Sequence, residues 1–344
     1  MTHCVRLSPR DARLLIRYLD GVDEVVTSRF TGGFNPHEDH LTDLLCEMLS
    51  DRIAAQHNLP YPLQSLRRDL TNGGRLLDVS LEIEAKRYSQ QVEGRVTFAD
   101  FGVIISHRDY VRPSNSFERA VLFQAKRLHR SGNRADFSLH DAFGAFDQQQ
   151  LKQLSDLIRG PLMKDGQLGC DWDGTFCYYL FYCPRLEAYD PQSREDLAYY
   201  TTPGGGWLDG WNRMEMQFHA LAEAQLLLEV SSDPTRHFPA MLASPLDWLV
   251  QMYFVNRDNI LQSSGNHEKV LARHVYERLW TGYHREAVIP FSWFLVYHML
   301  LGRSGSCSPN ALRIARGLIR DDEDVPVRPR YVITLRSQAG RERG

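Results

Sequence analysis

Two polar residues interrupt an apolar stretch in the middle of the chain, and this feature narrows the fold and function most. Residues 120–125 (AVLFQA) have the β-prone character of a buried strand, yet they include Gln124, and Lys126 follows directly. Side chains two residues apart on a strand share a face, so both should point to one side of a sheet. Burying such groups without partners is costly, which makes them candidates for a functional site.

The surrounding patterns are those of an α/β protein. Ser8 followed by Pro9 marks the start of a first helix. Helical spacing of apolar residues predicts a second helix after Asn35 and a third over residues 148–158. β-Prone segments lie at residues 76–84, 95–106, 120–125 and 176–182. Because helix and strand patterns are interspersed, we expect a mixed central sheet flanked by helices, with the core and its N-terminal helices in residues 1–185.

Beyond Pro184 the patterns become mostly helical. Helical spacing of apolar residues occurs at residues 214–228, 245–256, 267–283 and 289–301. One late strand is predicted at residues 330–335. We therefore expect a second, mainly α-helical region over residues 186–344, whose role the sequence does not define.

The composition favours a soluble, well-packed protein. The chain has 344 residues, of which 43% are hydrophobic and 24% charged. Its best candidate for a membrane span, residues 289–301, is shorter than the ~20 residues that a spanning helix needs, and no secretion leader is visible. The 6 cysteines include no CxxC pair, which indicates reduced thiols. We expect a cytoplasmic protein without membrane contact.

Asp100 adds a carboxylate to the two polar residues of the apolar strand. It lies within a second apolar pattern, FADFGVII, upstream of Gln124 and Lys126. Phosphodiester hydrolysis needs charge neutralisation on the phosphate, which a divalent metal held by oxygen ligands and a nearby ammonium can supply. Magnesium keeps several waters, so two or three protein oxygens suffice. Most of the 40 basic residues are arginines, so a lysine at position 126 is more informative than usual.

The motif formed by Asp100 and Gln124-Ala125-Lys126 resembles the QxK variant of the PD-(D/E)xK, or restriction-endonuclease-like, nuclease superfamily, as in Mrr-type restriction endonucleases. The resemblance implies that Asp100 and Gln124 are metal ligands and that Lys126 is the catalytic lysine. It also implies a glutamate on the helix before the sheet, a role that Glu38 matches as a further ligand. The expected cofactor is Mg²⁺, with Mn²⁺ as the alternative. Ala99 stands where the superfamily's name has proline.

The same resemblance implies a metal-dependent nuclease that hydrolyses DNA, with RNA as the alternative substrate. The implied setting is bacterial defence or restriction, and the expected partners are a second copy of the chain in a homodimer or a partner defence protein. Two alternatives stay open. The chain could be an effector subunit of a larger antiviral complex, activated by a partner or signal. It could also be a non-catalytic nucleic-acid-binding module that retains the nuclease fold.

Each site residue also has a structural interpretation. Asp100 could be a turn or edge-strand acid, and Asp78 is its rival for the ligand role. Gln124 could be a satisfied amide within the sheet. Lys126 could extend its ammonium to solvent from a strand end. In addition, Glu38 stands where a capping-box glutamate belongs if the helix is capped three residues earlier.

Other polar residues are weaker candidates. His37 and His40 share a helix face, but no third zinc ligand is evident. The net charge of −3 gives no global basic signal for nucleic acid, although arginines at near-helical spacing could supply a local one. These arginines are Arg313, Arg316 and Arg320. The resemblance also implies that Gln149, Gln150 and Gln153 lie near the DNA backbone. Three further histidines could contact phosphate or be ordinary surface residues: His107, His129 and His140.

Overall fold

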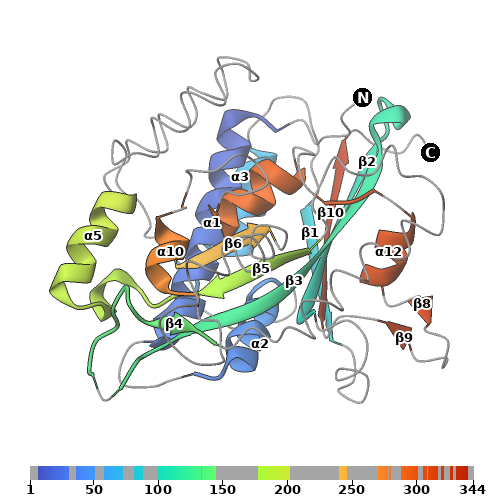
Figure 1. The fold of residues 1–344 in the computed structure, drawn as a ribbon. Helices are drawn as coiled ribbons and strands as arrows, with labels where there is room; N and C mark the ends of the chain where they lie inside the picture. The colour runs from blue at the N-terminus through green and yellow to red at the C-terminus, as the bar shows by residue number, and fades with distance from the viewer. Residues whose placement is uncertain are drawn as a thin grey trace, which may run out of the picture.

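The computed structural model describes residues 7–30, 36–50, 58–72, 81–87, 99–132, 134–144, 177–201, 240–245, 270–277, 279, 288–300, 305–307, 309–316, 319–320, 326–327 and 331–339. These residues form a mixed α/β structure in which a twisted central sheet is flanked by helices (Figure 1). Within the described part of the chain, no helix is both long and apolar enough to cross a membrane.

Helix α1 (Pro9–Thr27) begins where the sequence predicts. Ser8 is its N-cap, and the Ser8 hydroxyl accepts a hydrogen bond from the Asp11 amide at 3.1 Å. The Asp11 carboxylate accepts one from the Ser8 amide at 3.4 Å, which completes a reciprocal cap. A short 3₁₀ turn, η1 (Ser28–Phe30), follows α1.

Helix α2 (Glu38–Met48) is the helix expected after Asn35, but its first residue is Glu38 and its N-cap is His37. Leu41, Leu45 and Met48 are buried, as their helical spacing predicts. Helix α1 contacts both α2 and α3 (Leu63–Thr71), so the three N-terminal helices pack as one group.

The central sheet has eight strands in the order β1-β10-β2-β3-β5-β6-β7, with β4 paired to β3 off this path. The pairs β10–β2 and β3–β5 are parallel, and the other pairs are antiparallel. A separate two-stranded sheet joins β8 to β9. The strands are β1 (Leu81–Arg87), β2 (Phe101–Asp109), β3 (Phe117–His129), β4 (Ala142–Phe143), β5 (Cys177–Tyr182), β6 (Met241–Pro245), β7 (Ile289–Pro290), β8 (Ile319–Arg320), β9 (Pro326–Val327) and β10 (Tyr331–Ala339).

Two strand predictions need correction at their boundaries. Strand β3 is much longer than the predicted residues 120–125, because its polar ends pair with β2 and β4 although they break the apolar pattern. Asp100 was expected inside a strand, but it directly precedes β2. It therefore lies at the end of the sheet, where a carboxylate can be accommodated more easily than within a ladder.

Strands from the second half of the chain complete the same sheet. The predicted late strand is β10, and it lies between β1 and β2 rather than at an edge. Strands β6 and β7 extend the sheet on the other side of β5. The sheet therefore includes strands from both sides of residue 185, the sequence-predicted boundary between the nuclease core and the C-terminal region.

The described helical segments after residue 185 range from single turns to the 11 residues of α5 (Pro191–Thr201). Residues 289–301 were expected to be a single helix, but residues 289–300 begin as β7 and continue through a helical turn and a π-helical segment. Of the predicted helix 267–283, the structure describes residues 270–277 and 279, which include one five-residue helix. The helices predicted at 148–158, 214–228 and most of 245–256 lie outside the described residues. The helical segments not yet given are η4 (Pro113–Asn115), η5 (Leu186–Ala188), α10 (Ala272–Tyr276), α11 (Phe291–Trp293), η7 (Phe294–Leu300) and α12 (Pro309–Ala315).

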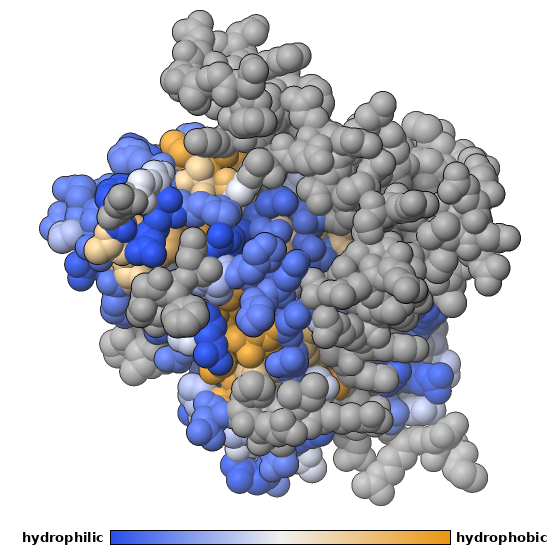
Figure 2. All heavy atoms as spheres, turned by 90° about the horizontal axis from the view of Figure 1, so that it is seen from below, coloured by the Kyte–Doolittle hydropathy of each residue, from blue (hydrophilic) through white to orange (hydrophobic). Residues whose placement is uncertain are grey.

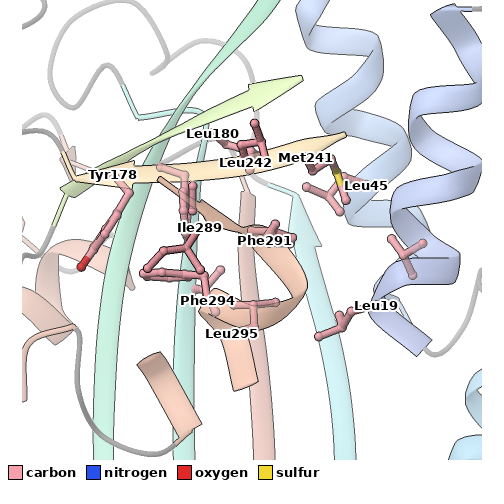
Figure 3. Packing of buried hydrophobic residues seen from close by; sticks show 14 of the residues in the cluster. Leu19, Leu45, Tyr178, Leu180, Met241, Leu242, Ile289, Phe291, Phe294 and Leu295 are labelled. Atoms are coloured by element: carbon pink, nitrogen blue, oxygen red, sulfur yellow. The ribbon is translucent and has the colours of Figure 1, made fainter. Parts of the chain in front are cut away.

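The core is rich in aromatic side chains. Phe101 and Phe123 stack across the β2–β3 pair with ring centroids 4.8 Å apart, and Phe291 and Phe294 meet Phe123 edge-on. Figure 3 shows Phe291 and Phe294 in a cluster of buried side chains that come from α1, α2, β5, β6 and the β7–η7 segment. The aromatic run of β5 is buried in the sheet.

Candidate active site

Two carboxylates occupy the edge of β3 where its pairing with β2 stops. The last pair of that ladder includes Phe123, whose carbonyl accepts a hydrogen bond from the Asp100 amide at 2.8 Å. Beyond it, the Ala125 amide donates to Asp100 Oδ2 at 2.6 Å, and the Arg127 amide donates to Glu38 Oε2 at 3.0 Å. Alternate amides of a strand face the same edge. Asp100 and Glu38 therefore replace the missing strand and are held side by side along β3.

Gln124 joins this group through its amide nitrogen. Nε2 donates to Asp100 Oδ2 at 2.7 Å and approaches the Ala125 carbonyl at 3.4 Å. The side chain is only 4% exposed, and Oε1 has no hydrogen-bond partner among the described residues. The interpretation of Gln124 as a satisfied sheet amide thus holds for the nitrogen and fails for the oxygen. A buried acceptor without a partner is uncommon and calls for a physical explanation.

Lys126 lies on the same face of β3 as Gln124. Its side chain is 9% exposed, and Nζ lies 4.0 Å from Glu38 Oε1. The alternative in which Lys126 extends its ammonium into solvent is therefore wrong. A buried ammonium needs a counter-charge, and Glu38 supplies it.

Glu38 is placed by the start of α2. Because His37 is the N-cap, Glu38 is the first helical residue, and the position of a capping-box glutamate lies two residues further on. The capping-box interpretation is therefore wrong. The His37 ring instead accepts a hydrogen bond from the Asp39 amide at 3.4 Å. The Glu38 carboxylate is left to contact β3.

The two carboxylates have raised pKa values. Burial raises the pKa of Asp100 to about 8; the charge of Glu38 adds to this rise, while the Ala125 amide and Lys126 oppose it. Burial also raises the pKa of Glu38, against the lowering effects of Lys126 and the Arg127 amide. Although Asp100 retains some solvent-accessible surface, the surrounding protein still disfavours its charged form. The site therefore holds acids whose negative charge is poorly compensated by the described residues.

Two residues that the sequence did not indicate connect α2 to the sheet beneath this site. The Tyr182 hydroxyl of β5 lies 3.2 Å from Thr42 Oγ1, and the Thr42 hydroxyl also lies 3.2 Å from the Glu38 carbonyl. Tyr182 is fully buried. The only available signal was the i, i+4 spacing of Glu38 and Thr42, and nothing in the apolar run around Tyr182 pointed to α2.

The other histidine candidates are scattered. His107 is buried and shares a 2.9 Å hydrogen bond with Ser337 of β10, so its interpretation as a surface residue is wrong. His37, His40 and His140 are exposed, and His129 is half-buried at the end of β3. Within the described ranges, no three His, Cys, Asp or Glu side chains form a cluster able to hold a metal. The oxygen of Gln124 would therefore have to be the third donor beside the two carboxylates.

Several remaining candidates do not contribute to this site. Arg313 is exposed on α12, Arg316 pairs with Glu118 of β3, and Arg320 lies in β8. The residues proposed as a rival ligand or as a DNA-contacting glutamine helix lie outside the described residues: Asp78, Gln149, Gln150 and Gln153.

No protein-family model, curated protein or solved structure matches this chain.

Proposed function

We propose that this protein is a metal-dependent nuclease that hydrolyses phosphodiester bonds of DNA, built on a restriction-endonuclease-like sheet. The observation that carries the proposal is the buried Gln124 oxygen, which has no partner among the described residues and belongs to a side chain bonded to Asp100. Glu38 and Lys126 lie along the same strand end. An orphaned acceptor, two poorly compensated acids and an ammonium are what a divalent-cation site for phosphoryl chemistry requires.

The residues fit Mg²⁺, with Mn²⁺ as the alternative. Asp100, Gln124 and Glu38 would hold the ion through oxygen atoms, the ligand type that Mg²⁺ prefers. The raised pKa values of Asp100 and Glu38 support this assignment, because a positive ion would favour the charged form of both acids. When bound, the ion supplies charge neutralisation at the phosphate and lowers the pKa of a water molecule.

The chain's own groups have separate roles in this proposal. Lys126 presents a fixed ammonium that stabilises the negative charge developing on the phosphate. Glu38 holds Lys126 in place, since their charged atoms lie 4.0 Å apart. The Gln124 amide nitrogen and the Ala125 backbone amide fix the orientation of the Asp100 carboxylate. Because these contacts come from β3, they require little rearrangement when the substrate binds.

DNA is the proposed substrate, with RNA as the alternative, and bacterial defence or restriction is the proposed setting. These details, together with a homodimer or a partner defence protein, rest on the resemblance of the Asp100, Gln124 and Lys126 motif to the QxK nucleases. The net charge of −3 supports a variant in which the protein is the effector of a larger antiviral complex. A nuclease that acts alone usually has a surplus of basic residues to follow the phosphate backbone.

A non-catalytic module with the same fold is the second candidate. Asp100 and Glu38 both accept hydrogen bonds from backbone amides of β3, so each has a structural role independent of any metal. Under this alternative the polar group only completes the sheet edge. DNA binding without cleavage, which survives the loss of the Lys126 ammonium, would favour it.

Incubation with supercoiled plasmid in Mg²⁺ or Mn²⁺, beside an EDTA control, tests the proposal. The wild type should nick or linearise the plasmid only with metal. Lys126→Met, which keeps the length of the side chain without its charge, should abolish cleavage. Arg112→Ala, on the exposed β2–β3 turn, is the matched control and should cleave like the wild type. Absence of cleavage by the wild type in either metal, at low salt, would contradict autonomous nuclease activity.

A further inference from the structure

The end of β3 carries a second polar pair beside the candidate metal site. Arg127 and His129 are two residues apart, so they share the face of β3 opposite Gln124 and Lys126. Strand β5 ends at the level of Arg127, and only β4 still pairs with β3 at His129. Both side chains are half-buried, so they remain accessible from solvent.

His129 presents its imidazole beside Gly144. It makes no hydrogen bond among the described residues, and a Cβ atom at position 144 would lie 3.2 Å from its Nε2 atom. The glycine at this position therefore keeps the space beside Nε2 open. Burial lowers the pKa of His129, and the positive charges of Arg127, His37 and Lys126 lower it further. At neutral pH the ring is an uncharged hydrogen-bond donor among cationic neighbours.

Both backbone polar groups of Arg127 are hydrogen-bonded. Its amide donates to Glu38 Oε2 at 3.0 Å, and its carbonyl accepts from the Gly144 amide at 3.3 Å. These two bonds fix the backbone from which the guanidinium extends, on the same strand segment as the candidate metal ligands. Arginine stays charged and presents several donors in a plane, which suits a phosphate group.

We propose that Arg127 and His129 bind the phosphodiester group next to the one that is cleaved, an inference that rests on the proposed nuclease function. Although Arg127 and His129 extend from the opposite face of β3, the charge of Glu38 acts on Arg127 and that of Lys126 acts on His129, so both side chains lie near the candidate metal site. Phosphates recur at regular intervals along a nucleic acid strand, so a phosphate at Lys126 brings its neighbour close to these donors. The Cα atoms of Arg127 and His129 are separated by about 7 Å along β3. Once a cation offsets Asp100 and Glu38, this end of β3 has surplus positive charge.

The surrounding surface is compatible with a polar ligand. Helix α2 and strand β4 lie in the lower part of the molecule in Figure 1, and the view from below shows mostly hydrophilic described residues around a central hydrophobic area (Figure 2). A phosphodiester backbone is bound mainly by polar and charged groups, which these hydrophilic residues supply.

Binding to a short DNA duplex in Mg²⁺, with Lys126→Met in every protein to prevent cleavage, tests this phosphate site when it is measured by fluorescence anisotropy over a series of salt concentrations. Arg127→Ala should weaken binding about tenfold and reduce the slope of log K against log salt by about 1, because one phosphate contact is lost. His129→Asn should weaken binding several-fold. Arg112→Ala and His140→Ala replace exposed residues of the same types and should leave both quantities unchanged.

Gly144→Ala provides a second variant that leaves both proposed contact residues in place. Its methyl group should displace the His129 ring and weaken binding as His129→Asn does. Unchanged affinity and salt slope in Arg127→Ala, His129→Asn and Gly144→Ala, combined with normal metal-dependent cleavage by the wild type, would overturn the phosphate site alone. A wild type that neither binds nor cleaves DNA would overturn the nuclease function and, with it, the phosphate site.

Discussion

At the scale of single residues, Asp100 is the most unusual group of the site. Its pKa is raised from 3.8 to about 8, mainly by burial, so the folded protein keeps a proton that the unfolded chain has lost over this range. A state that binds more protons is disfavoured as pH rises, so Asp100 should lower the free energy of unfolding progressively between about pH 4 and pH 8. Its position shows that sequence can reveal which polar residues are expensive to bury.

The pH dependence can be measured by thermal unfolding in EDTA. The wild type should lose stability between about pH 5 and pH 8, and Asp100→Asn should flatten this part of the curve, because an amide does not titrate there. The exposed aspartate of the loop after β3 gives the matched control, Asp136→Asn, which should follow the wild type. If the stability of Asp100→Asn falls as steeply with pH as that of the wild type, the pKa assignment is wrong.

At the scale of elements, the site depends on how α2 is attached to the sheet. Thr42 contacts both the Tyr182 hydroxyl and the Glu38 carbonyl, so it links β5 to the first turn of α2. The helical spacing after Asn35 predicted the helix but not this link, because Tyr182 lies far away in sequence within an aromatic run. The length of β3 was likewise underestimated, since its polar end is stabilised by Asp100, Glu38 and β4 rather than by apolar burial.

Replacing Thr42 tests this attachment. Thr42→Val keeps the shape but leaves the Tyr182 hydroxyl without its partner, so the free energy of unfolding should fall by about 1–3 kcal/mol. Glu38 should also be held less firmly, and the affinity for Mn²⁺ should fall. Thr42→Ser keeps the hydroxyl and should restore metal affinity. If both variants bind metal as the wild type does, Thr42 acts only in stability.

At the scale of the whole molecule, β10 joins the two ends of the described chain. It pairs with β1 on one side and β2 on the other, and the Tyr331 amide donates to the Asp100 carbonyl at 3.2 Å. The strand itself was predictable from its apolar pattern. Its place inside the sheet was not, because local patterns carry no information about pairing between residues that are far apart in sequence. For the same reason, sequence alone could not show that both halves of the chain share one sheet.

Truncation tests the role of β10. A chain that ends at residue 330 would expose the edges of β1 and β2, and the loss should exceed the 5–15 kcal/mol that typically stabilises a native fold. This chain should show no cooperative unfolding transition by circular dichroism. A chain that ends after Ala339 keeps β10 and should unfold cooperatively. Cooperative unfolding of the shorter chain would show that β10 is dispensable.

Calorimetric titration of the purified protein with Mn²⁺ tests the central claim most directly, since the claim is that Asp100, Glu38 and Gln124 together hold a divalent cation. The wild type should bind Mn²⁺ at one site per chain. Gln124→Met, which removes the amide oxygen with little change in size, should weaken binding about tenfold or more, whereas the exposed control Gln192→Met should bind as the wild type does. A wild type that binds no metal, or a Gln124→Met variant with unchanged affinity, would contradict the account.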